Sequence, residues 1–405
     1  MKMSKAGSPV QGDGDCFGAA RGTYEAGPRR SMLFTGVAAV ALLSGATLTR
    51  AADISNTTPF TNSGPYAGDV LSNSSTIANN PSGYWTGNIV SNTHLIANNV
   101  GATWDGGIQS NRSQIVNYGT WLNGDITGNG NPADPVPAVV GSNGRITNAA
   151  GATWHGDING NSDFVTNDGG AWFGNISGNA SYVLNNGGTW TGNVVGNSGS
   201  GRFTQVFNGG NGLWVGDVQG NNGLVGNDGN WQGSVLGNSR TLQNSGTWTG
   251  NVAGNSGNVY NTNGRWTGDV LANGGTIYNR TSGGVVAVWT GNVSGNAGSI
   301  QNEAGSQWHG DVTANSGTIV NAAAAIWTGN VAGNAGTIAN SGTWTGMVAN
   351  SGTFNNAAGA TVSGLLTNSG TTNNAGTLSG GLTNTAGIVN NTGSIGGPPG
   401  STAAR

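Results

Sequence analysis

The feature that most constrains this chain of 405 residues is a tryptophan that recurs at nearly regular intervals. From Trp85 to Trp344 most intervals are 17 to 19 residues long, and three longer ones, of 33, 24 and 23 residues, carry insertions. With one exception, Gly follows the tryptophan two positions later and Val or Ile four positions later, as in Trp190, Gly192 and Val194. A short fixed period of this kind is typical of stacked repeats, in which each unit forms one coil.

The positions within one repeat predict two short strands. Side chains alternate between the faces of a strand, so the tryptophan and the residues two and four positions later are expected on the inward face of one strand. Trp121 departs, because Gly124 and Ile126 each come one place later, which predicts a local bulge. In the second strand an aliphatic residue precedes Asn by two positions. The pairs are Ile77/Asn79, Ile96/Asn98, Ile115/Asn117, Val225/Asn227, Leu242/Asn244, Ile277/Asn279, Ile319/Asn321 and Ile338/Asn340.

These strands predict an all-β fold, a parallel β-helix or β-solenoid of roughly 17–19-residue coils. Apolar residues nowhere follow a useful run of the 3.6-residue helical period, so helices are not expected. One coil buries too little apolar surface to be stable alone, and stacking on its neighbours supplies the rest. Seventeen or eighteen coils, about 4.8 Å apart, would make a rod about 80 to 90 Å long.

Two columns of side chains are expected to run along this rod. The Asn of the second strand has the inward parity of its aliphatic neighbour, which predicts a ladder of amides hydrogen-bonded from coil to coil. Asn in a merely turn-adapted role is the alternative. The tryptophans are expected to point inward as core. If they pointed outward instead, an aromatic stripe could stack on glycans.

Residues 1–51 are predicted to be a leader with a signal peptide. Arg29 and Arg30 form its positive region, the apolar run of residues 33–48 follows, and small residues around Arg50 favour cleavage after Ala51. A single membrane anchor and a twin-arginine signal are the alternatives. The rest of the chain is divided into an entry segment at 52–65, Trp-containing coils at 66–353, Trp-less terminal coils at 354–395 and a flexible tail at 396–405.

The composition after residue 51 excludes several kinds of partner. This part has no Lys and no Cys, and its seven Arg against thirteen acidic residues give a net charge of −6. A weakly acidic surface without Lys does not suit nucleic acid or anionic lipid. An exported chain without Cys must be stable without disulfides.

The repeats resemble the passenger region of bacterial autotransporters, the type V secreted proteins. The resemblance rests on Asn-Ser-Gly-Thr and Asn-Ala-Gly-Thr steps such as residues 367–371 (TNSGT) and 374–378 (NAGTL), and it covers about residues 52 to 395. It implies a Gram-negative origin and a parallel β-helix displayed at the cell surface, commonly for adhesion or aggregation. Family members end in a translocator β-barrel of alternating strands, and no such segment precedes Arg405.

Residues that could carry chemistry are few after the leader. Polysaccharide cleavage needs two facing carboxylates or a carboxylate with a basic partner. Glu303 is the one Glu, and the Asp residues at the third position after Trp alternate with Asn, which predicts a solvent-facing role. Those residues are Asp69, Asp157, Asp217, Asp269 and Asp311, with Asn88, Asn193, Asn251, Asn292 and Asn330 as equivalents.

The histidines and the Gly-Asn-Asp-Gly segment at 226–229 are the candidates for metal binding. His155 and His309 occupy equivalent slots about eight coils apart and cannot share one ion, and His94 lies elsewhere. The segment at 226–229 is single, whereas calcium-binding nonapeptides occur in tandem. We therefore expect no catalytic residue, no metal site and no cofactor.

The expected function is that of a surface-displayed or secreted β-helical structural or adhesive protein. Host-cell, matrix or glycan ligands and a separate outer-membrane translocator are the expected partners. The alternative is a carbohydrate-binding rod that uses exposed aromatics or turn insertions, and a polysaccharide-degrading enzyme comes third.

Overall fold

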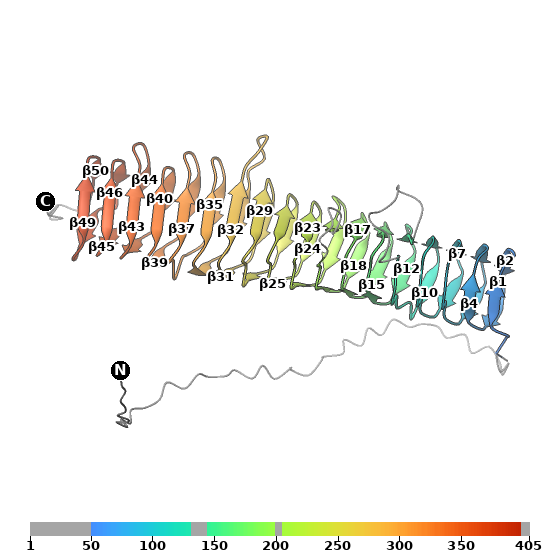
Figure 1. Cartoon of the computed structure of the whole chain (residues 1–405). Coiled ribbons are helices and arrows are strands. Elements are labelled where there is room, and N and C mark those ends of the chain that lie inside the picture. The colour runs from blue at the N-terminus through green and yellow to red at the C-terminus, as the bar shows by residue number, and fades with distance from the viewer. Residues whose placement is uncertain (1–49, 131–143, 199–204, 398–405) are drawn as a thin grey trace, which may run out of the picture. The chain divides into compact units, whose positions relative to one another are not determined.

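The computed structural model describes residues 50–130, 144–198 and 205–397, which form one elongated β-solenoid (Figure 1). It has about 18 turns of roughly 18 residues each. Every named element in these ranges is a β-strand, and none of the described residues belongs to a helix able to cross a membrane. The predicted all-β solenoid is confirmed. Residues 1–49 of the predicted leader, which include the charged and apolar parts of the signal peptide, lie outside the described residues.

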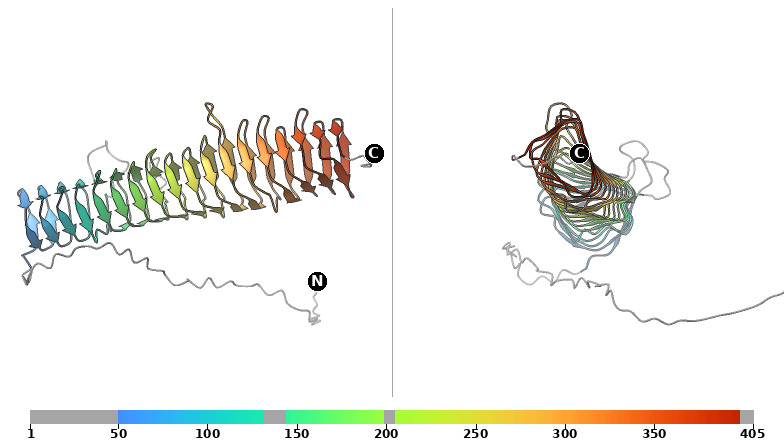
Figure 2. Two further views of the ribbon diagram at one scale, coloured as in Figure 1. Left: turned by 180° about the vertical axis from the view of Figure 1, so that it is seen from behind. Right: turned by 90° about the vertical axis from the view of Figure 1, so that its left-hand side faces the viewer.

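Three parallel sheets run the length of the solenoid, and most coils give one strand to each. We number the sheets 1, 2 and 3 in the order in which the first coil enters them. Within each sheet a strand pairs in parallel with its counterparts in the neighbouring coils. Seen along its axis, the rod shows the coils lying one behind another (Figure 2).

The strands of sheet 1 are short, and the coils of Ile89, Ile108, Ile126 and Val312 join it by isolated bridges at the aliphatic residue and at the Asn three positions later. Its strands are β1 (Ile54–Asn56), β4 (Val70–Asn73), β13 (Ile158–Asn159), β16 (Ile176–Ser177), β19 (Val194–Val195), β22 (Val218–Gln219), β25 (Val235–Leu236), β28 (Val252–Ala253), β31 (Val270–Asn273), β34 (Val293–Asn296), β39 (Val331–Asn334), β42 (Val348–Asn350), β45 (Leu366–Asn368) and β48 (Leu382–Asn384).

Sheet 2 contains the predicted aliphatic-x-Asn strands. They are β2 (Phe60–Asn62), β5 (Ile77–Asn79), β7 (Ile96–Asn98), β9 (Ile115–Asn117), β11 (Ile146–Asn148), β14 (Val165–Asp168), β17 (Tyr182–Asn186), β20 (Gln205–Asn208), β23 (Leu224–Asn227), β26 (Thr241–Asn244), β29 (Asn258–Thr262), β32 (Thr276–Arg280), β35 (Ser299–Asn302), β37 (Thr318–Asn321), β40 (Thr337–Asn340), β43 (Thr353–Asn356), β46 (Thr371–Asn374) and β49 (Ile388–Asn391).

Sheet 3 contains the tryptophan strands. They are β3 (Pro65–Ala67), β6 (Tyr84–Thr86), β8 (Thr103–Asp105), β10 (Thr120–Leu122), β12 (Thr153–His155), β15 (Ala171–Phe173), β18 (Thr189–Thr191), β21 (Leu213–Val215), β24 (Asn230–Gln232), β27 (Thr247–Thr249), β30 (Arg265–Thr267), β33 (Val288–Thr290), β36 (Gln307–His309), β38 (Ile326–Thr328), β41 (Thr343–Thr345), β44 (Thr361–Val362), β47 (Thr377–Leu378) and β50 (Ser394–Ile395).

The prediction that the tryptophan and the aliphatic residue four positions later share one strand is wrong. In the coil of Trp190, strand β18 ends before Gly192, and Val194 starts β19 in sheet 1. The chain turns at Gly192, where a Cβ atom would lie 1.9 Å from the carbonyl oxygen of Gly174 in the preceding coil. Only Gly fits such a close approach. In the coil of Trp121 the extra residue lies at this corner and not inside a strand.

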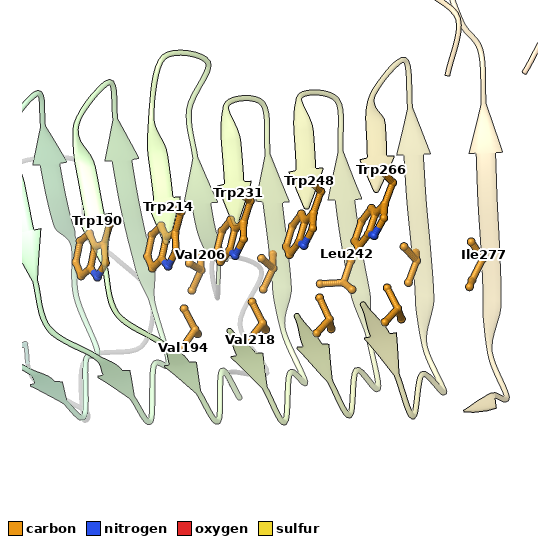
Figure 3. Packing of buried hydrophobic residues seen from close by; sticks show 14 of the residues in the cluster. Trp190, Val194, Val206, Trp214, Val218, Trp231, Leu242, Trp248, Trp266 and Ile277 are labelled. Carbon is orange, nitrogen blue, oxygen red and sulfur yellow. The ribbon is translucent and has the colours of Figure 1, made fainter. Parts of the chain in front are cut away.

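The tryptophans fill the core, as predicted. All 14 are at most 1% exposed, and they stack on one another beside two columns of Val, Ile and Leu (Figure 3). Consecutive ring centroids are 4.5–5.0 Å apart with planes within 14° of parallel. Tyr66 takes the place of Trp in the first coil, and Val362, Leu378 and Ile395 take it in the last three.

The glycine of the Trp-x-Gly motif also provides a carbonyl oxygen that accepts a hydrogen bond from the indole N–H of the next coil. The Nε1–H of Trp190 donates to the carbonyl oxygen of Gly174 at 3.0 Å, and Trp248 donates to Gly233 at 2.9 Å. Every tryptophan makes the equivalent bond. A buried indole N–H therefore always has an acceptor, as burial of a polar group requires.

The predicted asparagine ladder is present in sheet 2. The Nδ2–H of each ladder Asn donates to Oδ1 of its counterpart in the next coil, as from Asn261 to Asn279 at 2.8 Å. The same amide group reaches the carbonyl oxygens of Gly264 and Val288, each at 3.0 Å. Buried amides are thus bonded both along the rod and to its turns, which rules out the merely turn-adapted role.

A second asparagine ladder, which we did not predict, runs through sheet 1. The Nδ2–H of Asn197 donates to Oδ1 of Asn221 at 2.8 Å, and Asn221 donates in turn to Asn238 at 2.7 Å. Both ladders point the same way, with the donor in the earlier coil and the acceptor in the later one. The solenoid is therefore held together by two directional chains of amides in addition to its backbone bonds.

Candidate functional site

The Asp and Asn residues at the third position after Trp lie at the corner between sheets 3 and 1. Their side-chain oxygens accept the backbone N–H of the same slot in the next coil, as Asp157 accepts from Asn175 at 2.6 Å and Asn193 from Asp217 at 2.7 Å. Asp and Asn side chains both carry an acceptor oxygen, Oδ1, at the same distance from the backbone, which explains why the two residues interchange at this position. These residues are exposed or half-buried, but their primary role is to cap the corner.

Asp125, which the extra residue after Trp121 moves to the fourth position, occupies the same corner, and with Asp157 of the next coil it has the residue types of a glycosidase site. Such a site needs one carboxyl group kept protonated by burial beside an ionised one. Asp125 is exposed, and its Oδ1 accepts the backbone N–H of Asp157 at 2.8 Å. Glu303 lies at a different corner, between sheets 2 and 3, where its carbonyl oxygen accepts the N–H of Ser306. Within the described ranges no ion pair or hydrogen bond joins Glu303 to an Asp.

The three histidines lie apart on the outer surface. His155 stacks on Phe173 of the next coil, with ring centroids 4.7 Å apart and planes 10° apart. Burial lowers the pKa of His155 below its ordinary value, so this side chain is neutral at pH 7. His309 lies 3.4 Å from the Oε1 atom of Gln307. In the part of the chain that the structure describes, no three His, Cys, Asp or Glu side chains come together to hold a metal ion.

The insertion before Trp289 forms a small projecting hairpin. Ser282 and Val285 face each other in an antiparallel bridge, and Gly283 and Gly284 between them have φ values of 67° and 88°. Left-handed conformations at both central positions favour Gly in such a turn. Val285 and Val286 are exposed at its tip, 57% and 42% respectively. The Pro-rich insertion at residues 131–137 lies outside the described residues.

A shallow groove lies on the outer face of sheet 2 in the last coils. Its volume is ≈ 340 Å³, at the lower end of the range for small-molecule sites. One wall consists of Asn355, Asn373 and Asn390, which occupy the same outward position of β43, β46 and β49. The other wall contains Ala357 and Ala375, at the corner that leads to sheet 3. No sequence pattern that we considered predicts this groove, because the three Asn resemble the ladder residues next to them.

The chain matches no family model, and comparison with curated proteins and with solved structures gave no match. The geometry of the described residues is therefore the basis for a functional assignment.

Proposed function

We propose that this chain is exported and acts at the cell surface, in the manner of an autotransporter passenger, as an elongated rod for cell or matrix contact. The observation that carries the proposal is the difference between the inward and the outward positions of each coil. Inward positions repeat the same Trp, aliphatic and Asn residues, whereas outward positions differ from coil to coil. The variable outer faces are thus the part of the molecule available for recognition.

Export is supported by the way in which the solenoid is stabilised. In the described part of the solenoid, the backbone, Asn-ladder and indole bonds join each coil to the coils next to it, and the sequence after residue 51 contains no Cys. A chain of this kind can cross a membrane unfolded and then fold coil upon coil, without an oxidation step. Contacts between distant parts of the sequence are not required.

A contact role also agrees with the outward side chains. The candidates for chemistry are dispersed over different corners and faces, as the places of Glu303, His155 and Asp157 illustrate. The tryptophans are buried and cannot offer an aromatic stripe to glycans. Function as an enzyme is therefore the weaker proposal.

The proposal is tested in the native host by fractionation and by protease treatment of intact cells. We expect the product in the outer-membrane or extracellular fraction, beginning near Ala52, and accessible to the protease. Cells that lack the gene should attach less to matrix-coated surfaces or to one another. Recovery of the full-length product from the cytoplasm would refute export and, with it, the contact role.

A matched internal deletion tests whether the length of the rod is what matters. Removal of residues 231–307 takes out four whole coils and joins Asn230 to Trp308, which preserves the register of sheet 3. We expect the shortened chain to fold, to be exported and to support weaker attachment. Wild-type attachment by this variant would show that the outer faces of those coils and the rod's length are both dispensable.

A further inference from the structure

The groove on sheet 2 is bordered by a third, outward-facing row of amides. Asn390 donates from Nδ2 to Oδ1 of Asn373 at 2.8 Å, and Asn373 donates to Oδ1 of Asn355 at 2.7 Å. Asn355 and Asn373 are half-buried, and Asn390 is exposed. This row points in the opposite direction to the buried ladders, since here the donor belongs to the later coil.

The outward row has hydrogen-bonding capacity left over. An Asn amide can donate two hydrogens and accept two. In the described part of the chain, Nδ2 of Asn355 donates no hydrogen bond, Nδ2 of Asn373 and of Asn390 each donates one, and Oδ1 of Asn390 accepts none. The mutual bonds fix these side chains in place, so a ligand can meet preformed donors and acceptors with little loss of side-chain entropy.

The middle of the opposite wall is apolar, between Ser341 and Thr392 at its ends, and the whole groove is uncharged. Ala357 and Ala375 are exposed and present their methyl groups on successive coils. The remaining lining residues are Asn, Ala, Ser and Thr, with no ionisable side chain among them. A charged ligand would lose its hydration without gaining a counter-charge, so the groove favours a neutral one.

We propose that this groove binds a neutral, linear glycan lying along the rod axis. Successive coils are about 4.8 Å apart, which is close to the length of one sugar unit in an extended β-linked chain. Two successive sugars can each place a hydroxyl pair against one amide of the row and C–H groups against one of the two Ala, and a third sugar can meet Asn390 and the hydroxyl of Thr392. Glycan binding gives the proposed contact surface a ligand class, and only the biological role of the groove rests on the proposed contact function.

A polypeptide strand suits this groove less well. Strand addition requires an open sheet edge with free backbone N–H and C=O groups. The backbone of β43 and β46 is already paired with the coils on both sides. The groove therefore offers side-chain amides and methyl groups, which match the hydroxyl and C–H groups of sugars.

Calorimetric titration of the purified protein tests the proposal. The probes are neutral β-linked hexasaccharides of glucose and of N-acetylglucosamine, with a hexamer of a uronic acid as the charged counterpart. We expect one of the neutral hexamers to bind and the uronic acid hexamer to bind at least tenfold more weakly. Absence of binding by both neutral hexamers, or tighter binding of the charged one, overturns the proposal.

Three variants place the binding in the groove. Asn373→Leu removes the central amide, Ala375→Glu introduces a charge on the opposite wall, and Gln243→Leu changes the same outward column of sheet 2 far from the groove. The first two should weaken binding at least tenfold, and the third should leave it unchanged. Equal affinity in all three variants overturns the assignment to this groove.

The same variants, expressed in the host, separate this inference from the proposed function. Surface display with normal attachment by Asn373→Leu cells would refute the groove as the contact site and leave the contact role intact. A cytoplasmic product whose purified form binds the neutral hexamer through the groove would refute the contact role and leave the binding site intact.

Discussion

The clearest test of the fold concerns a single residue of the sheet 2 ladder, Asn261. This side chain is fully buried. It accepts a hydrogen bond from Nδ2 of Asn244 at 2.7 Å and donates to Oδ1 of Asn279 at 2.8 Å. Replacement by Leu preserves the number of side-chain atoms and breaks the ladder at both of these contacts.

The cost follows from the groups left without partners. The carbonyl oxygen of Gly264 keeps a bond from the N–H of Val288. Oδ1 of Asn279 and one N–H of Asn244, however, lose their partner in Asn261 and stay buried. An orphaned amide group costs about 1–3 kcal/mol, and the apolar burial of Leu offsets part of the sum. We therefore expect Asn261→Leu to lower the free energy of opening this coil by about 2–4 kcal/mol.

Native-state hydrogen exchange is the appropriate assay, because a repeat protein can open locally. The amides of Leu242, Val259 and Ile277, on the three coils involved, report the opening. Asn258→Leu is the control: Asn258 is exposed on the same strand, β29, and this change should stay within about 0.5 kcal/mol. If the two variants lose equal protection, or Asn261→Leu loses less than about 1 kcal/mol, the ladder does not stabilise the solenoid as argued.

Three further predictions concern single sites. Gly250→Ala would place a Cβ atom 2.0 Å from the carbonyl oxygen of Gly233, so we expect a loss of at least about 3 kcal/mol in chemical unfolding; normal stability would contradict the close packing of the corners. Thr372 occupies an inward position of sheet 2, and its hydroxyl is the one buried side-chain group among the described residues that has no hydrogen-bond partner. Thr372→Val should therefore stabilise the terminal coils by about 1–2 kcal/mol, and a loss of stability would show that the hydroxyl has an unseen partner. The pKa of His155, measured by NMR, should lie below that of an ordinary histidine, because burial disfavours the charged form of the ring. The contribution of His155 to the free energy of unfolding is then complete above the pKa that this residue has in the unfolded chain, and it decreases as the pH falls below that value. Phe173→Ala should raise the pKa of His155 towards the ordinary value. An unchanged pKa would mean that Phe173 does not bury the ring.

The parts of the fold that follow from a strict period of two were predictable. The inward Trp, the aliphatic residues of sheet 2 and their Asn ladder all follow from alternation along one strand. The second Asn ladder, in sheet 1, does not follow from this alternation. Asn197 comes three positions after Val194, an odd spacing that in a regular strand places it on the opposite face. Gly196 between them has a φ of 63°, and this left-handed residue interrupts the alternation of side chains, so that Asn197 points inward like Val194. The recurrent Gly-Asn pair at this place was the signal for it.

The spacing of residues did not predict the three-sided cross-section of the solenoid, for a related reason. Trp190, Gly192 and Val194 have the parity of one strand, but the glycine is a corner, and its close contact with Gly174 is a relation between coils that spacing within one coil does not reveal. The groove was hidden in another way. Asn355 and the ladder residue Asn356 are adjacent in sequence, and only the pairing of neighbouring coils shows that one amide row faces outward and the other inward.

The tryptophan column makes this protein a one-dimensional array of chromophores. Its indoles lie 4.5–5.0 Å apart and nearly parallel, shielded from water along the whole stack. Light absorbed by one ring is therefore not confined to that ring, since excitation passes readily between neighbours at such distances. Fluorescence from the rod reports the column and not any single tryptophan, its polarisation decays by energy migration, and one quencher beside the stack dims many emitters at once.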